Sequence, residues 1–217
     1  MSKPLTTLQS CNDVLGLQTG DDPINDRLVM RYIRVASDLF EKLTNVVWSY
    51  EPTVVQKMPS KGGRSLYGFS NLPLLSVSEV RYQDQVQDED GYEIDGIMLT
   101  RKSNQGWWHN TDYYDNTSYV SSRKSSYEAS KDYQITYEAG YITPQQAIDD
   151  DSLERTLPYD LEDAIIEFVK FKYLNSDRNE GIASESTDAW SISYAQGIDN
   201  VPSTFKGMVR KYRVYLL

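Results

Sequence analysis

The chain has 217 residues, a length that suits one domain or a small core domain carrying an insertion. Its formal net charge is −10, and an acidic surface repels nucleic acid, because phosphate binding needs clustered Lys and Arg. A single cysteine, Cys11, excludes an internal disulfide. The first residues lack the features of a secretory signal, and no apolar run approaches the ~20 residues of a membrane span. We therefore expect no membrane association and a protein made in the cytosol.

The N-terminal part of the chain is expected to be helical. Thr6 or Thr7 can cap a short helix that Gly16 ends. A longer helix is expected to begin at Asp22-Pro23, with Asp as its cap and Pro at its first position. The apolar residues of this helix recur at helical spacing and predict a buried stripe of Ile24, Leu28, Val35, Leu39 and Leu43, broadened by Met30, Ile33, Ala36 and Phe40.

The middle of the chain, about residues 46–141, has the pattern of strands. Segments 76–82 and 133–137 alternate apolar and polar residues. Asp90-Gly91 and Asp95-Gly96 are turn dipeptides between short apolar runs. Several short antiparallel strands are the simplest explanation of this pattern.

The C-terminal part returns to helical patterns. Thr143-Pro144 and the acidic run 149–151 are expected to form a connector, and Pro158 is expected to open a helix over about 159–175. A polar loop, 176–200, and an amphipathic segment, 202–217, follow. The predicted fold class is α+β: three main helices and a C-terminal amphipathic segment form a core from residues 1–45 and 142–217. An antiparallel β unit, 46–141, is inserted into this core.

No residue pattern points to catalysis, a metal or a cofactor. His109 is the only histidine, and its neighbours suggest neither a triad nor a metal site. Cys11 lies on an apolar helix face, where packing is its expected role. The acids between Asp88 and Asp95 do not match the spacing of a calcium loop in either register. Nucleotide-binding glycine motifs are absent from the sequence, so we expect no enzyme.

Aromatic residues cluster in the predicted β unit, and two interpretations of them stay open. Exposed aromatic rings on a sheet can stack on sugars, which would make the insertion a carbohydrate-binding or other binding module. The same rings can instead fill the core of a small sheet or contact a neighbouring subunit. The cluster comprises Trp107, Trp108, Tyr113, Tyr114 and Tyr119.

The order of several segments resembles the head–tail connector (adaptor) family of tailed bacteriophages. The resemblance lies in a short helix ending at Leu15-Gly16 before a long helix, a Leu72-Pro73 step into a strand, and the segment 135–141 with its Tyr-x-Ala-Gly-Tyr pattern before Pro144. It continues through Phe171-Lys172-Tyr173, Ser191-Ile192-Ser193-Tyr194 and the closing segment from Val201-Pro202 to Tyr212-Arg213. The β insertion is longer than this family leads us to expect.

The resemblance implies a structural virion protein rather than an enzyme. Such proteins form a ring, usually of twelve subunits, below the portal protein at the head–tail neck. They extend the channel through which the genome is packaged and ejected, and they dock the tail or a stopper (head-completion) protein. DNA then passes without specific binding, which suits an acidic subunit. The protein would be present in the host cytoplasm during assembly and in the virion afterwards.

Two groups of residues are candidates for contacts with the portal or with a neighbouring copy. The polar loop carries Trp190, Ile192 and Tyr194, which can anchor on a neighbour or pack onto their own subunit. The basic end of the chain can pair with an acidic portal surface or form a solvated helix end; it comprises Arg210, Lys211, Tyr212 and Arg213. The helix over 159–175 is a further candidate for a ring contact.

Overall fold

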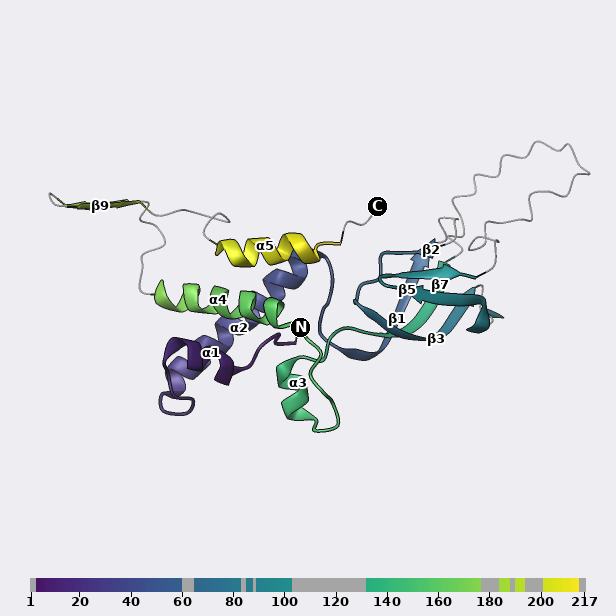
Figure 1. Ribbon diagram of the computed structural model, residues 1–217, viewed down its shortest axis with the longest axis horizontal. Coiled ribbons are helices and arrows are strands. Elements are labelled where there is room, and N and C mark those ends of the chain that lie inside the picture. The colour runs from purple at the N-terminus through teal and green to yellow at the C-terminus, as the bar shows by residue number, and fades with distance from the viewer. Residues whose placement is uncertain are drawn as a thin grey trace, which may run out of the picture. The chain divides into compact units, whose positions relative to one another are not determined.

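The computed structural model describes residues 3–59, 65–82, 85–87, 89–102, 132–176, 184–187, 190–193 and 201–214 (Figure 1). Its contacts divide the chain into two compact units. One is helical and combines Met1–Asn45 with Ile142–Val214, and the other is the β unit Val46–Tyr141. The described elements are helices and antiparallel sheets, which confirms the predicted α+β class.

The helical unit joins segments from both parts of the chain. Its helices are α1 (Leu8–Leu15), α2 (Pro23–Thr44), α3 (Pro144–Asp149), α4 (Tyr159–Leu174) and α5 (Ser203–Tyr212). Helix α4 packs against α2, and α5 and α1 each contact both of them. Strands β8 (Ser184–Thr187) and β9 (Trp190–Ser193) form a hairpin within the segment that the sequence predicted as a loop.

Helix boundaries follow the capping residues. The Thr7 hydroxyl accepts a hydrogen bond from Ser10 N at 3.0 Å, and Gly16 ends α1 in the left-handed conformation with φ of 70°. The Asp22 carboxylate accepts a hydrogen bond from Ile24 N at 2.9 Å, and Pro23 occupies the first turn of α2. These contacts confirm both predicted helix starts.

The face that α2 buries agrees only in part with the predicted stripe. Ile33, Ala36 and Phe40, which the sequence predicts to broaden the stripe, are buried, and Val29 is buried with them on the face that packs on the other helices. By contrast, Ile24 is 70% exposed, Val35 44% and Leu43 37%. The prediction that these three residues form the buried stripe is wrong, because α2 carries two apolar stripes and the core covers the other one.

Aromatic rings from three helices form the centre of the helical core. The Phe205 ring of α5 lies 5.7 Å from that of Phe40 and 4.9 Å from that of Phe168, centroid to centroid. All three side chains are fully buried. Since each ring comes from a different helix, this cluster fixes α2, α4 and α5 to one another.

A buried polar network ties the N-terminal segment to α4. The Glu162 carboxylate accepts a hydrogen bond from the Thr6 hydroxyl at 2.7 Å, and the Arg155 guanidinium lies 2.7 Å from its second oxygen. Burial, together with the charge of Glu162, raises the pKa of the Cys11 thiol to about 12. Cys11 is therefore an unreactive core residue, in agreement with its predicted packing role.

The β unit is organised around one central strand, β7 (Asp132–Ala139). Its neighbours are β1 (Glu51–Pro59) and β3 (Leu74–Tyr82), and β4 (Gln85–Val86) extends the sheet beyond β3. All of these pairs are antiparallel. Along β7 the buried residues Tyr133, Ile135, Tyr137 and Ala139 alternate with less buried ones, as the sequence pattern predicted.

A second, smaller sheet belongs to the same unit. It consists of β2 (Ser65–Leu66), β6 (Met98–Arg101) and β5 (Tyr92–Asp95), in that order. Gly96 has a positive φ of 60° in the turn between β5 and β6, at the predicted Asp-Gly position. A short 3₁₀ helix, Glu89–Gly91, precedes β5.

The Ala139-Gly140-Tyr141 step closes the end of β7 by a backbone contact. Gly140 has φ of 98°, and a Cβ atom there would lie 2.6 Å from the Ser49 carbonyl carbon. This close approach lets Tyr141 N donate to Trp48 O at 2.7 Å and Tyr50 N donate to Tyr141 O at 2.8 Å. Only glycine satisfies both the backbone conformation and the lack of space.

Candidate functional site

The described residues of the helical unit include a small acidic surface at α3. Thr143 caps this helix in a reciprocal capping box: Gln146 N donates to the Thr143 hydroxyl at 3.3 Å, and Thr143 N donates to Gln146 Oε1 at 3.1 Å. Pro144 occupies the first turn. The sequence predicted only a connector here, so the helix is a correction.

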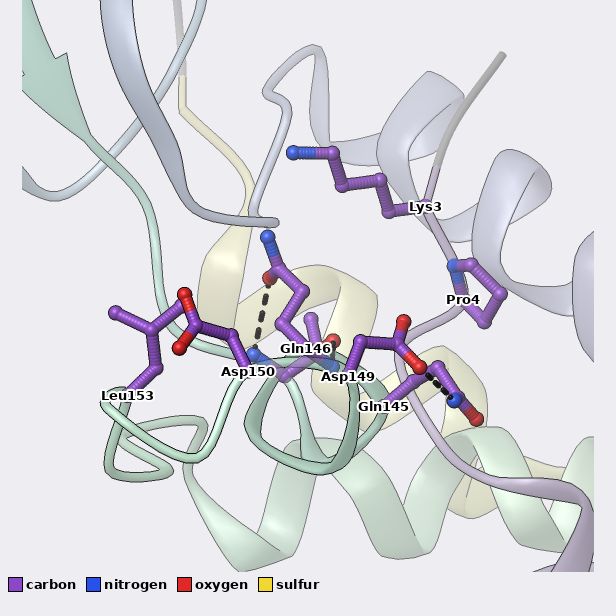
Figure 2. Close-up of a pocket in the computed structure, with 8 residues that line it drawn as sticks. Lys3, Pro4, Gln145, Gln146, Asp149, Asp150 and Leu153 are labelled. Carbon is purple, nitrogen blue, oxygen red and sulfur yellow. Dashed lines mark hydrogen bonds between the residues drawn. The ribbon is translucent and has the colours of Figure 1, made fainter.

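Helix α3 and the N-terminal segment line a pocket of about 360 Å³ (Figure 2). Lys3 and Pro4 lie on one side of it, and the α3 residues lie on the other. Its lining consists of Lys3, Pro4, Thr143, Gln145, Gln146, Asp149, Asp150 and Leu153. The pocket thus combines two carboxylates and two amides with one ammonium group and two apolar side chains.

Acidic groups dominate the surface around this pocket. Asp149 accepts a hydrogen bond from the Gln145 amide at 2.8 Å. Hydrogen bonds from the Ser152 hydroxyl, at 2.6 Å, and from Ser152 N, at 2.9 Å, hold the pKa of Asp150 below its usual range. We call this surface the acidic corner; it comprises the exposed residues Ile148, Asp149, Asp150, Asp151 and Glu154.

The chemistry of the acidic corner favours a cationic partner. Its carboxylates and amide oxygens accept hydrogen bonds, so an arginine or lysine side chain fits it better than a phosphate does. Across the described ranges of the chain, no three His, Cys, Asp or Glu side chains are arranged to hold a metal ion. None of the described helices is both long and apolar enough to cross a membrane.

The second candidate surface is the exposed side of α2. Its apolar members are the stripe that the sequence predicted as buried, and three exposed arginines lie beside them. We call this surface the outward face of α2; it comprises Ile24, Leu28, Val35, Leu39 and Leu43 with Arg27, Arg31 and Arg34. An apolar stripe flanked by arginines is a composition typical of protein interfaces.

Two residues of the predicted basic end of the chain, Lys211 and Tyr212, make contacts inside the helical unit. Lys211 forms an ion pair with Asp160, and the Tyr212 hydroxyl donates to the same carboxylate at 3.3 Å. The hydrogen bond from Lys211 holds the pKa of Asp160 below its usual range. Arg210 is exposed in the last turn of α5, and Arg213 is exposed at the C-cap position of this helix.

The structure describes only two of the other predicted contact residues, Trp190 and Ile192. Trp190 and Ile192 lie in β9 of the hairpin. The remaining predicted residues lie outside the described residues: Tyr194, Trp107, Trp108, Tyr113, Tyr114, and also Tyr119 and His109. Their roles therefore stay predictions.

No protein-family model matches this chain, and no curated protein matches it. Solved structures do match its fold. One is a chain from the neck of an empty gene transfer agent particle, computed with C6 symmetry, with a TM-score of 0.52 and 14% identity. The match covers 98% of this chain and 92% of that one. Another is a chain of the virion of the native gene transfer agent particle, with a TM-score of 0.56, 13% identity and the same coverage.

These matches extend over nearly the whole length of both chains, so they include the helical unit and the β unit together. The protein therefore has a fold that is found in the neck of a gene transfer agent particle.

Proposed function

We propose that the chain is a structural protein of the neck of a tailed, phage-like particle. Within that neck it acts as a head–tail connector: it forms a ring below the portal protein, extends the DNA channel, and docks the tail or a stopper protein. The observation that carries this proposal is the fold match to a neck chain over 98% of this sequence. The order of segments along the sequence, which resembles the connector family, supports it independently.

The ring is the part of the proposal that the neighbour's symmetry supports. The matching neck was computed with C6 symmetry. Rings of six and of twelve identical subunits both contain a sixfold axis, so the twelve copies implied by the family resemblance fit this symmetry. A closed ring of identical subunits needs head-to-tail contacts between two different surfaces of each copy.

The charge of the chain suits a channel that DNA must pass. Each copy contributes a net charge of −10, so a ring repels the phosphates of the genome instead of binding them. This repulsion would let DNA slide during packaging and ejection. The proposal assigns no catalytic residue and no cofactor to the chain.

The proposal is tested by the protein content of purified particles. Quantitative mass spectrometry should find this chain in mature particles in a fixed ratio to the portal protein, at about six to twelve copies per particle. Its absence from mature particles would contradict the proposal. A monomer in free solution would not, because assembly on the portal can supply the contacts that form the ring.

A further inference from the structure

The outward face of α2 is an apolar stripe that the helical core leaves exposed at Ile24, Val35 and Leu43 and half-buried at Leu28 and Leu39. At about 100° per residue, its five apolar members fall within roughly one third of the helix circumference. The buried residues Val29, Ile33, Ala36 and Phe40 lie about 105° away around the same helix. Ile24 is 70% exposed and Val35 44% exposed. An exposed apolar stripe of this length is a typical docking surface.

A row of arginines follows one edge of this stripe. Arg27, Arg31 and Arg34 are all exposed, and none of them takes part in the salt bridges found among the described residues. The Arg27 Nε donates to Pro23 O at 3.1 Å, which leaves the other guanidinium donors available. Asp26, the residue before Arg27, accepts hydrogen bonds from the Asn12 amide at 2.9 Å and from Gly20 N at 2.8 Å, and Asp38, four residues after Arg34, pairs with Lys42 at 2.6 Å. The row is therefore a basic surface on a strongly acidic protein.

The acidic corner has the complementary composition. Ile148 is 65% exposed there, and four exposed acids surround it: Asp149, Asp150, Asp151 and Glu154. An apolar side chain among carboxylates matches an apolar stripe beside guanidinium groups. Arginine pairs with carboxylates through two parallel hydrogen bonds, which gives such a contact a defined geometry.

The two surfaces lie on opposite flanks of α2. The pocket at the acidic corner is lined by Lys3 and Pro4 (Figure 2), and the next residue, Leu5, donates its N–H to the Ser37 hydroxyl at 3.1 Å. Around α2, Ser37 lies about 180° from the middle of the apolar stripe. A copy that binds through one surface therefore leaves the other free for the next copy, as a head-to-tail ring requires.

We propose that the outward face of α2 on one copy docks on the acidic corner of the next copy, and that this contact closes the ring. This inference rests on the proposed function. In the contact, an arginine of the α2 row occupies the pocket beside Asp149 and Asp150, and Ile148 packs against the apolar stripe. The occupant is thus a second copy of this chain.

Charge reversal of each surface in turn provides the test. The gene for this chain is inactivated in the particle's genome, and the full-length chain is expressed from a separate gene in the cells that assemble the particles. The amount of the chain per purified particle is then measured. One variant carries Arg31→Glu with Arg34→Glu, and another carries Asp149→Arg with Asp151→Arg. Each should lower incorporation at least about tenfold, because like charges then meet across the contact. The variant with all four changes should regain incorporation, because reversed surfaces again attract each other.

A matched control reverses two exposed acids on β5, Glu93→Arg with Asp95→Arg, and should incorporate like the unmodified chain. The inference is overturned if either single-surface variant incorporates normally, if the fourfold variant fails to recover, or if the β5 control alone is lost. A variant that merely misfolds cannot be rescued by two further changes, so recovery separates docking from folding. Absence of the unmodified chain from particles overturns the proposed function itself.

Discussion

The helical unit and the β unit reach stability by different routes. The helical unit joins residues before 46 with residues after 141, and side chains from three helices meet in the ring cluster around Phe205. The described residues of the β unit all lie between Val46 and Tyr141, and a backbone contact at Gly140 closes the end of its central strand. Side-chain packing is therefore critical at the centre of the first unit, and backbone conformation is critical at the end of the central strand of the second. Substitutions that change only side-chain packing, or only backbone conformation, should therefore destabilise one unit more than the other.

The largest expected effect is in the helical core. Phe205→Ala should lower the free energy of unfolding of the helical unit by about 4 kcal/mol, since it removes the ring that contacts both Phe40 and Phe168. Chemical denaturation followed by circular dichroism measures this. Val35→Ala is the control, because this residue is 44% exposed on the same unit and should change stability by less than about 0.5 kcal/mol. Equal losses in both variants would refute the assigned core.

The corresponding test of the β unit is Gly140→Ala. The new Cβ would meet the Ser49 carbonyl group in a backbone conformation that alanine disfavours, so we expect a loss of about 3 kcal/mol. Gly96→Ala is the matched control, since Gly96 also has a positive φ but has no atom within 4 Å of the added Cβ. It should cost about 1 kcal/mol. Thermal unfolding distinguishes the two, and a neutral Gly140→Ala would remove the backbone explanation.

A smaller effect is expected at the buried polar network of the helical unit. Glu162→Gln leaves the Arg155 guanidinium without its carboxylate partner and should cost about 2 kcal/mol. The combined variant Glu162→Leu with Arg155→Met removes both charges and should recover most of this loss. A double-mutant cycle from Glu162→Leu, Arg155→Met and their combination, measured by urea denaturation, gives the coupling energy. No recovery would show that the two residues act separately.

The smallest effect concerns pH. The pKa of Asp160 is lowered in the folded protein by its hydrogen bond from Lys211, so this contact stabilises the fold above the unfolded pKa of about 4. The stabilisation is lost as the pH falls through the folded pKa. Because both side chains are partly exposed, the effect should stay below about 1 kcal/mol. Asp160→Asn should flatten this part of the stability profile between pH 5 and pH 2, and an unchanged profile would contradict the assignment.

The sequence predicted the elements that have local signals. Asp22-Pro23 marks the start of α2, and the period-two alternation of 133–137 marks β7. Strand β1 was missed, because Pro52 and the consecutive Val54-Val55 interrupt its alternation and a register shift follows Glu51. Helix α3 was missed as well, although Thr143 and Gln146 form the capping box that signals it.

The candidate surfaces were harder to predict for a physical reason. Helical spacing predicts one broad apolar stripe on α2 but cannot tell which part of it the core covers, because that depends on α4 and α5. The acidic run 149–151 is evident in the sequence. That it lies beside a pocket is not, because Lys3 and Pro4, which line the pocket with it, are far away in sequence. The aromatic residues of 107–119 lie outside the described residues. The carbohydrate-binding alternative for them therefore stays a prediction: Trp107→Ala would abolish retention on a glycan if it were correct.

The central claim, that this chain is a ring-forming neck protein, is tested most directly by an averaged image of the neck in purified particles. We predict a ring of density around the DNA channel below the portal, in which each subunit accommodates the helical unit and the β unit as two separately fitted bodies. A neck whose density is fully explained by other proteins, or this chain located elsewhere on the particle, would contradict the account.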